Sequence, residues 1–262
     1  GFAPDTRQGL YLALRQKGLA DDLIVASGVC AKPDDGGPPY DRFRGRIIFP
    51  IRDGRGRAIS LGGRAMAADA RAKYLNGPET ELFDKGRNLY NHAPAREASG
   101  KGQPLVVAEG YMDVIALCEA GFKAAVAPLG TAVTEDQLRL MWRISDEPII
   151  ALDGDTAGIR AALRVIDLAL PLLEAGKGLR FAVLPTGQDP DDLIKSQGAG
   201  AMKAVLDGAQ PMVNLLWQRE IEGRSFDSPE RKAGLEKALQ THLSRIHDKS
   251  IFSHYDKEIK RL

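Results

Sequence analysis

The sequence predicts an α/β protein in which a central parallel-sheet domain is flanked by two smaller subdomains. Apolar, strand-like runs alternate with helical patterns between residues 105 and 184, which is typical of parallel strands joined by crossover helices. The preceding residues mix short helices with a hairpin pattern, and the last part of the chain is helical in pattern. We therefore expect an N-terminal mixed α/β basic subdomain (1–103), a central domain (104–197) and a C-terminal helical subdomain (198–262).

The N-terminal part begins with two short amphipathic helices, expected at 10–17 and 21–28. A loop rich in Gly and Pro follows at 32–39. Two strands, 46–51 and 57–61, are separated by the residues Arg-Asp-Gly-Arg-Gly, which are typical of a hairpin turn. We therefore expect an antiparallel pair of strands in this subdomain.

The central part repeats a strand followed by a helix, with short connections. The expected elements are strand 105–109, helix 112–120, strand 124–128, helix 134–144, strand 148–153, helix 157–174 and strand 180–184. This order predicts a parallel sheet with right-handed crossovers. Beyond it, helical patterns at 202–206, 212–222 and 229–246 predict the small helical subdomain.

The composition is that of a soluble globular protein. Of the 262 residues, 44% are hydrophobic and 27% are charged, and no apolar run approaches the roughly 20 residues that a transmembrane helix needs. No signal-peptide pattern opens the chain. Cys30 and Cys118 have no metal-ligand spacing, so we interpret them as two buried thiols in a reducing cytoplasm. The chain starts without Met and stops within an amphipathic pattern, which we interpret as a fragment.

The net charge of +1 conceals an asymmetry along the chain. Residues 1–103 carry 17 Lys and Arg against 12 Asp and Glu, whereas residues 104–262 carry 19 against 23. Residues 42–87 alone hold 11 basic and 5 acidic residues. A basic lobe followed by an acidic one suits a polyanion that is held against a metal-binding carboxylate cluster. The alternative for many of these side chains is a solvated charged face.

Three carboxylates follow the ends of two predicted strands. Asp153 and Asp155 end the apolar run 148–152, and their Cβ atoms lie roughly 6–7 Å apart on one side of an extended chain. Glu109 ends the run 105–108. Mg²⁺ binds a few carboxylates together with water and phosphate oxygens, so this edge is a candidate magnesium site. The alternatives are an acidic turn that caps the next helix and, for Glu109, an acid favoured by a helix dipole.

Asp189 and Asp191 form a further acidic cluster after strand 180–184. They either cap the next helix or complete the metal site from outside its inner ligands. The Asp-x-Asp-Thr pattern at 153–156 also resembles the nucleophile motif of haloacid-dehalogenase-type phosphatases. In that family the fifth position is Thr or Val, whereas this chain has Ala157, and the motif normally lies on the first strand of the domain.

A Glu at one strand end and an Asp-x-Asp about forty residues later resemble the Toprim domain of topoisomerases, bacterial primases and small nucleases. Separated motifs extend this to a resemblance to bacterial DnaG-type DNA primases, in the order found in that family. They are YDRFRGRIIFPI (40–51), GGR (62–64), KYLNGPET (73–80), FDKGR (83–87), EGYMDV (109–114), PLGTA (128–132), DGDTAG (153–158) and GQDPDDL (187–193). The resemblance is dense over residues 1–197, and the helical tail matches only in character.

The resemblance implies site residues by position. Glu109, Asp153 and Asp155 would be catalytic and hold Mg²⁺, for which Mn²⁺ would substitute, with Asp189 and Asp191 in support. Whether Glu109 binds metal or accepts a proton stays open. The nucleotide- and template-binding residues would be Arg64, Lys73, Asn76, Lys85, Arg42 and Arg44. Arg42, Arg44 and Arg46 alternate along the chain. For these three arginines a solvated face is an equal alternative to a template contact. Tyr74 and Tyr90 either stack on unpaired bases or belong to the core.

The resemblance also implies a nucleotidyltransferase that makes short RNA primers on single-stranded DNA from ribonucleoside triphosphates. It would act as a monomer in the bacterial cytoplasm, at the replication fork and away from membranes. Two distant cysteines cannot form the family's zinc ribbon. We expect the family's replicative-helicase-binding domain and the start of its basic subdomain to lie outside this fragment. The alternatives are a Toprim nuclease or topoisomerase, although Tyr111 is badly placed as a topoisomerase nucleophile, and a DNA clamp without catalysis.

Overall fold

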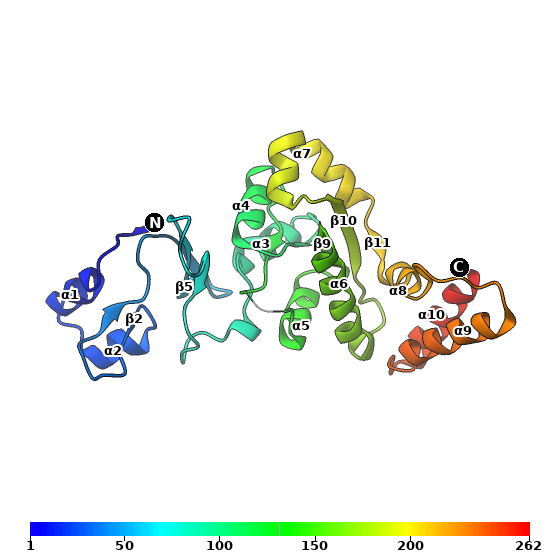
Figure 1. The fold of residues 1–262 in the computed structure, drawn as a ribbon, viewed down its shortest axis with the longest axis horizontal. Coiled ribbons are helices and arrows are strands. Elements are labelled where there is room, and N and C mark those ends of the chain that lie inside the picture. Colours follow the sequence, from blue (N-terminus) through cyan, green and yellow to red (C-terminus); the bar gives the residue numbers. More distant parts are fainter. Residues whose placement is uncertain (131) are drawn as a thin grey trace. The chain divides into compact units, whose positions relative to one another are not determined.

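The computed structural model describes residues 1–130 and 132–262. Thr131, which belongs to the motif at 128–132, lies outside the described residues. The chain divides into two compact units, Gly1–Ala93 and Pro94–Leu262, and each is described by itself (Figure 1). Within the described ranges no helix combines the length and the apolar character needed to cross a bilayer.

The first unit contains a four-stranded antiparallel sheet, a two-stranded sheet and short helices. Its elements are β1 (Phe2–Ala3), α1 (Gly9–Gln16), α2 (Asp21–Ala26), β2 (Cys30–Ala31), β3 (Tyr40–Asp41), β4 (Arg46–Arg52), β5 (Ala58–Ala65), β6 (Tyr74–Asn76) and the 3₁₀ turn η1 (Lys85–Arg87). The larger sheet has the order β1-β4-β5-β6, and β2 pairs with β3. Pairing of β4 with β5 confirms the predicted hairpin.

A buried carboxylate organises the start of this unit. Asp41 is 4% exposed and accepts hydrogen bonds from the backbone N–H groups of Leu10 (2.8 Å) and Tyr11 (2.9 Å). Because the first N–H groups of a helix have no partner within it, Asp41 supplies the missing acceptors for α1. The Cys30 thiol also points at Asp41, and burial together with this carboxylate raises the pKa of Cys30 to about 11. Cys30 is therefore a protonated, buried thiol, whereas Cys118 is only partly buried.

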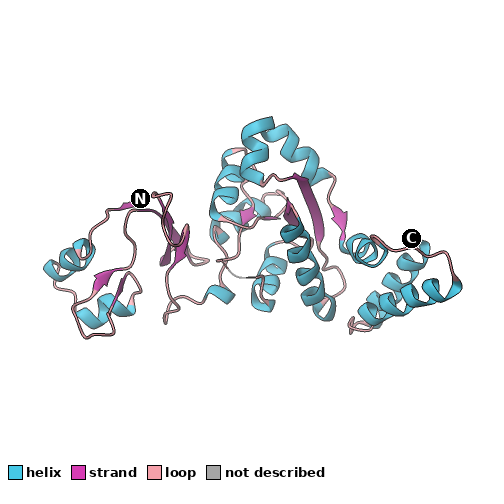
Figure 2. Cartoon of the chain, in the orientation of Figure 1, coloured by secondary structure: helices cyan, strands magenta, loops and turns pink. Residues whose placement is uncertain are grey.

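The second unit is built on a five-stranded sheet with helices on both faces (Figure 2). Its elements are α3 (His92–Gly100), β7 (Val106–Val107), α4 (Tyr111–Glu119), β8 (Ala125–Val126), α5 (Glu135–Ile144), β9 (Ile149–Gly154), α6 (Thr156–Ala169), η2 (Leu170–Leu172), β10 (Arg180–Thr186), α7 (Pro190–Asp207), β11 (Gln210–Pro211), α8 (Met212–Ile221), α9 (Pro229–Leu243) and α10 (Lys249–Arg261). The strand order is β11-β10-β9-β7-β8. Strands β7 to β10 are parallel, as predicted, and β11 is antiparallel to β10.

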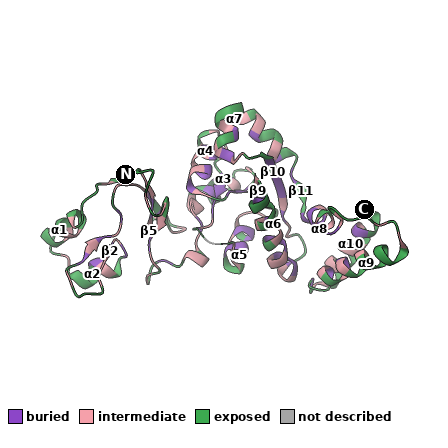
Figure 3. Cartoon of the chain, in the orientation of Figure 1, coloured by how far each residue is buried: buried purple, intermediate pink, exposed green. Residues whose placement is uncertain are grey.

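The core of the second unit lies on the two faces of β9. Helices α4 and α7 pack together on one face, and α5 and α6 pack on the other (Figure 1). Residues 149–152 are all buried (Figure 3), because a parallel strand is covered on both faces and reads as a continuous apolar run. This explains why the sequence indicated the strand so clearly.

Side-chain caps set the helix starts at one edge of the sheet. The Thr134 hydroxyl accepts from the N–H of Gln137 (3.1 Å), whose side chain bonds back to the N–H of Thr134 (3.1 Å). Asp155 caps α6 through the N–H of Gly158 (2.7 Å). Helix α6 was predicted to continue to residue 174, but it ends at Ala169, because Pro171 cannot donate a hydrogen bond within a continuing helix.

The predicted division into three subdomains stays a prediction, because the structure keeps residues 198–262 in the same unit as the sheet. Ion pairs link the two parts. Asp167 of α6 accepts from Arg219 of α8 (2.9 Å) and from Arg245 (3.0 Å), which follows α9. Gly198, at the predicted boundary, has a left-handed φ of 81° and interrupts α7.

Candidate active site

The predicted acidic residues meet at the carboxyl edge of the parallel sheet. Glu109 follows β7, Asp153 lies near the end of β9, and Asp155 is the N-cap of α6. Asp189 is the N-cap of α7 after β10, and Asp191 lies in the first turn of that helix. Since β7, β9 and β10 are neighbouring parallel strands, their carboxyl ends reach the same edge. In open α/β sheets this edge is where ligands bind.

Asp153 is the least satisfied of these carboxylates. Its Oδ1 atom is buried and has no hydrogen-bond partner among the described residues. Burial, together with the negative charges of Glu109, Asp113, Asp189 and Asp155, raises the pKa of Asp153 to about 7. Such a cluster of repelling acids around an unpaired buried oxygen needs a cation to be stable in its charged form.

Glu109 lies at the rim of the cluster and is an exposed residue. Partial desolvation of its carboxyl raises its pKa, and the charges of Asp155 and Asp189 act in the same direction, whereas Arg164 of α6 lowers it. Glu109 and Arg164 line one cavity of about 350 Å³ whose floor is apolar. Asp155 lines a larger cavity of about 940 Å³, bounded by α6, β10 and α8.

The capping interpretation of two of the aspartates is confirmed. Asp155 and Asp189 each use one oxygen to cap a helix, through the N–H of Gly158 (2.7 Å) and of Asp192 (2.7 Å). Asp191 pairs with Lys195 (2.6 Å). A carboxylate has two oxygens, so capping leaves room for a second role and fixes the direction of the side chain.

The donor set fits Mg²⁺ in chemistry, although it is not a closed cage. In the described part of the chain, no three His, Cys, Asp or Glu side chains converge closely enough to hold an ion by themselves. Mg²⁺ is usually held by one or two carboxylates together with water and substrate phosphates, so an open site is what it requires. The unpaired Oδ1 of Asp153 and its all-carboxylate surroundings therefore fit this ion.

Asp113 is a site residue that sequence reasoning missed. It is 7% exposed on α4, and its side chain accepts from the N–H of Gly110 (3.0 Å) and from the N–H of Asp191. Burial raises its pKa to about 6, with Asp189 adding to the effect, while the two backbone donors oppose it. Asp113 thus joins the loop after β7 to the start of α7. Its place three residues after Gly110, as in a capping box, was the available signal.

We expect Asp113→Ala to loosen this junction and to weaken the binding of divalent ions by about tenfold, the lower end of the range for residues that support ligands. Asp113→Asn keeps one acceptor and should lose less. Isothermal titration with Mn²⁺ measures both variants. Unchanged Mn²⁺ affinity in a folded Asp113→Ala variant would show that the loop after β7 and the start of α7 keep their positions without the Asp113 carboxylate.

The close approach of β9 and β10 explains why residue 154 is a glycine. In the structure, a Cβ atom at this position would lie 2.0 Å from the carbonyl oxygen of Pro185. Gly154 also exchanges backbone hydrogen bonds with Gly187 and Gln188, both 3.2 Å. The glycine is therefore required by the neighbouring strand, because no side chain fits there.

The predicted basic residues lie in the first unit, where the structure brings some of them together. Arg64 of β5 stands opposite Tyr74 of β6, and Gly62 stands opposite Asn76, so these side chains share one face of the sheet. The Lys73 ammonium lies 5.9 Å from the centre of the Tyr74 ring. Tyr74 is 41% exposed, which leaves its ring accessible rather than in the core.

The remaining basic residues have different surroundings. Lys85 begins η1, and its backbone N–H bonds to the Glu79 carboxylate (3.2 Å). Arg44 is exposed, and Arg42 is partly buried. The Nε atoms of Arg42 and Arg64 are buried without a hydrogen-bond partner in the described chain.

Arg46 has contacts with its own unit that the sequence did not suggest. Its guanidinium donates to the carbonyl oxygens of Ala72 (2.9 Å), Lys73 (3.3 Å) and Gly63 (3.4 Å). It therefore ties the segment before β6 to the sheet. The sequence could not show this, because the acceptors are backbone atoms of distant residues.

Comparison with known proteins identifies the family. Residues 1–96 match the family model of the DNA primase catalytic core, N-terminal domain, and residues 103–183 match that of the Toprim domain. The DNA primase of Rickettsia felis is 42% identical over 255 residues, which is 97% of this chain and 42% of that protein. The DNA primase of Escherichia coli K12 is 40% identical over 246 residues, 94% of this chain and 42% of that protein. The chain thus spans about two-fifths of the length of these relatives.

Solved structures agree with this assignment over the whole chain. A DNA primase domain from Pseudomonas aeruginosa superposes with a TM-score of 0.90 at 37% identity, covering 100% of this chain and 81% of that one. A DnaG primase catalytic domain bound to single-stranded DNA superposes with a TM-score of 0.88 at 36% identity, covering 100% and 84%. Tyr111 is 5% exposed, which further disfavours a topoisomerase-type nucleophile there. The chain belongs to the DnaG family of bacterial DNA primases, and its fold is that of their catalytic core.

Proposed function

We propose that this chain is a primase catalytic core that polymerises ribonucleotides on single-stranded DNA. The reaction is a nucleotidyl transfer in which a 3′-hydroxyl attacks an α-phosphate and pyrophosphate leaves. The observation that carries the proposal is the unpaired, buried Oδ1 of Asp153 among the carboxylates at the carboxyl edge of the sheet. A site of this kind suits phosphoryl chemistry, in which catalysis is mostly positioning and charge neutralisation.

Membership of a Toprim primase family implies the use of divalent metal ions, and we propose that the ion is Mg²⁺, with Mn²⁺ as a substitute. Glu109, Asp153 and Asp155 would hold it, with Asp189 and Asp191 in support. When bound, such ions neutralise charge that develops on phosphate oxygens. The fixed side-chain directions of Asp155 and Asp189, set by helix capping, would keep their remaining oxygens aimed at this edge.

The chain's own residues would hold the substrates. Arg64, Lys73, Asn76 and Lys85, with Arg42 and Arg44, would bind the phosphates of ribonucleoside triphosphates and of the template, Arg through its paired donors and Lys through a compact charge. The exposed ring of Tyr74 beside Lys73 would stack on an unpaired base. The Glu109 carboxyl, whose pKa is raised, would act as a metal ligand or accept the proton of the attacking hydroxyl.

The proposed partners follow from the relatives. Besides the DnaG domain bound to single-stranded DNA, the RNA polymerase domain of Mycobacterium tuberculosis primase DnaG, in complex with double-stranded DNA, superposes with a TM-score of 0.80 at 31% identity. We propose that this chain binds single-stranded template and releases an RNA primer as a monomer. It would do so at the cytoplasmic replication fork, with the replicative helicase bound through a region outside this sequence.

Incubation with single-stranded DNA, Mg²⁺ and labelled ribonucleotides tests the proposal. We expect short RNA that depends on the template, on Mg²⁺ and on all the nucleotides that the template requires. Shortened DNA instead of RNA would show a Toprim nuclease. Binding of DNA with neither product, also when a pre-annealed primer is supplied, would show a binding module and overturn the polymerase proposal.

Lys73→Ala should weaken the binding of single-stranded DNA or nucleotide by about three- to tenfold at low salt and less at high salt, because phosphate contacts by Lys are screened by salt. Fluorescence anisotropy across a salt series measures this. Lys17→Ala, an exposed lysine of the same unit at the end of α1, is the matched control and should bind as the wild type does. A defect of Lys73→Ala that does not depend on salt would indicate a folding fault instead.

A further inference from the structure

Helix α6 carries two exposed arginines on the side of the sheet where the acids meet. Arg160 and Arg164 are four residues apart, so they lie on the same face of the helix, with a rise of about 6 Å between them. Neither makes a hydrogen bond or an ion pair within residues 1–130 and 132–262. Their guanidinium groups are therefore available to a ligand.

The pair does not serve the stability of the helix. The ion pairs at this spacing elsewhere in the second unit join opposite charges: Lys101–Glu97, Arg139–Glu135, Lys195–Asp191, Lys203–Asp207, Arg224–Glu220, Arg231–Asp227 and Lys260–Asp256. Two other like-charged pairs have this spacing, Arg139–Arg143 of α5 and Lys257–Arg261 of α10, but in each of them one arginine is already bonded to a glutamate. Two like charges at this spacing repel each other instead. Asp167, the acid nearest along the helix, already accepts from Arg219 and Arg245. A like-charged pair of this kind, with no ion-pair partner among the described residues, suits an external anion.

The pair lies beside the candidate active site. Helix α6 begins directly after Asp155, and Arg164 lines the cavity of about 350 Å³ together with Glu109. Long side chains on a helix point back toward its N-terminus, which here is the carboxyl edge of the sheet. Arg160 and Arg164 thus place positive charge next to a group of carboxylates that would by itself repel phosphates.

We propose that Arg160 and Arg164 bind the phosphate backbone of a single nucleic-acid strand that runs along α6 past the acidic edge. This inference rests on the proposed function, because a strand must reach the acids for them to act on it. A strand fits better than a triphosphate, because the two arginines follow each other along an exposed surface instead of converging on one point. Only Arg164 of the two lines the cavity beside Glu109. Arginine contacts to phosphates are independent of base sequence.

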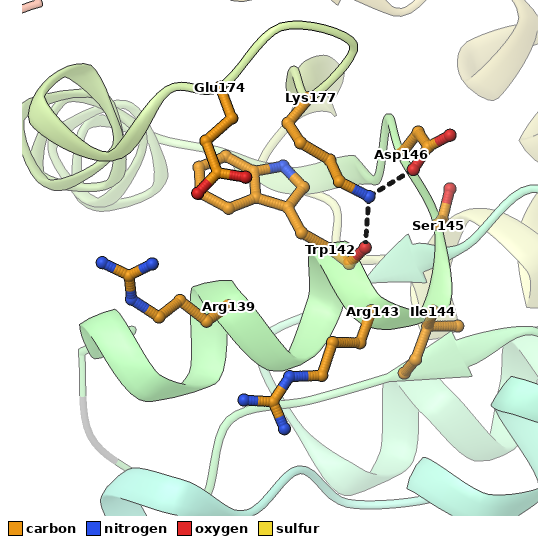
Figure 4. Close-up of a pocket in the computed structure, with 8 residues that line it drawn as sticks. All are labelled: Arg139, Trp142, Arg143, Ile144, Ser145, Asp146, Glu174 and Lys177. Atoms are coloured by element: carbon orange, nitrogen blue, oxygen red, sulfur yellow. Dashed lines mark hydrogen bonds and ion pairs between the residues drawn. The ribbon is translucent and has the colours of Figure 1, made fainter. Parts of the chain in front are cut away.

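Arg143 provides a matched control. It lies in the last turn of α5, which leads to the start of β9 and so to the opposite edge of the sheet. It is also exposed, and in the described chain it takes part in no hydrogen bond or ion pair. Figure 4 shows its guanidinium apart from the bonds that join Lys177 to Asp146 and to the carbonyl oxygen of Trp142. Arg143→Ala therefore removes the same charge from the same unit at a distant place.

The test measures the affinity of Arg160→Ala, Arg164→Ala, the double variant and Arg143→Ala for a labelled oligothymidylate between about 50 and 200 mM salt. The double variant should bind about tenfold more weakly at the low-salt end. The slope of log K against log salt should fall by about 1.4, the value for two lost contacts to a single strand. Arg143→Ala should match the wild type, and the melting temperatures of all variants should stay close to that of the wild type.

The outcomes separate this inference from the proposed function. If the wild type makes RNA primers and the double variant binds the oligonucleotide as tightly as the wild type, this inference is overturned and the proposed function stands. Equal weakening by Arg143→Ala, or a higher KM for ribonucleotides with unchanged oligonucleotide affinity, overturns it too. If the wild type makes no RNA but the double variant binds more weakly with a smaller salt slope, the inference stands and the polymerase proposal falls.

Discussion

Asp153→Asn should lower ribonucleotide incorporation by about 10²- to 10⁴-fold, while the affinity for single-stranded DNA stays within about twofold of the wild type. The expected size follows from the several kcal/mol of charge stabilisation that a metal site supplies, at about 1.4 kcal/mol per tenfold change in rate. The substitution keeps the shape of the side chain and removes the charge of the least satisfied carboxylate. Single-turnover primer extension and fluorescence anisotropy measure the two quantities. Glu174→Gln, which makes the same chemical change at an exposed position of the second unit, should leave both unchanged.

The same substitution should stabilise the metal-free protein. The pKa of Asp153 in the folded protein is raised to about 7 from an ordinary 3.8. The contribution of the protonated carboxyl to the stability of the fold is therefore complete below about pH 4 and is lost as the pH rises through 7. Asp153→Asn removes this loss, so at pH 8 the variant should be more stable by about 1–3 kcal/mol, the range for an unsatisfied buried group. At pH 4 the difference should vanish.

Mg²⁺ should reverse this order of stability. It should raise the melting temperature of the wild type, because a ligand that binds only the folded state stabilises that state, and it should have little effect on Asp153→Asn. Thermal unfolding with EDTA and with Mg²⁺ gives the comparison. Equal loss of polymerisation and of DNA binding, or a variant that is less stable than the wild type in EDTA at pH 8, would contradict the role of Asp153 as a metal ligand.

Gly154→Ala should destabilise the fold by about 3 kcal/mol, the upper part of the range for overpacking. The added Cβ would lie 2.0 Å from the Pro185 carbonyl oxygen and 2.7 Å from that of Leu184, and both contacts are with backbone. Neither strand can move aside without breaking the β9–β10 pairing that sets Asp153 and Asp155 at the edge. Urea denaturation measures the loss of stability, and primer synthesis should fall with it.

Gly234→Ala is the matched control for this effect. Gly234 lies within α9, and a Cβ atom there would meet nothing within 4 Å. The substitution should therefore stabilise the protein by about 0.4–1 kcal/mol, because alanine reduces the freedom of the unfolded chain. A Gly154→Ala variant as stable as the wild type would mean that β10 yields at Pro185, and the close approach of the strands would not be the reason for the glycine.

The positions of the strands and acids could be predicted because they depend on local pattern. The run 149–152 is apolar without interruption because both of its faces are covered, and Glu109 and Asp153 stand at the ends of such runs. The carboxyl ends of parallel strands reach one edge of a sheet, so the alternation predicted that these residues share an edge. That β7 and β9 are direct neighbours in the sheet came from the structure. The family motifs agreed with that pattern, and the comparisons confirmed the family.

Other features depend on residues distant in the chain and could not be predicted. Asp113 bonds to backbone groups on both sides of it in sequence, including the start of α7. Arg46 is occupied by carbonyl oxygens near residue 73, and Gly154 is constrained by Pro185. In each case the partner is a backbone atom, which has the same chemistry in every residue and so leaves no signal in the sequence.

The sequence by itself determined the alternation of strands and helices and the edge at which the carboxylates lie. Both follow from the local pattern of apolar residues and from the direction of parallel strands. Only the tertiary structure decided which oxygen is left without a partner, which glycine lets two strands approach closely, and which arginines remain without an ion pair. These depend on how closely non-neighbouring backbones approach and on which charges are already paired, and both are set by packing.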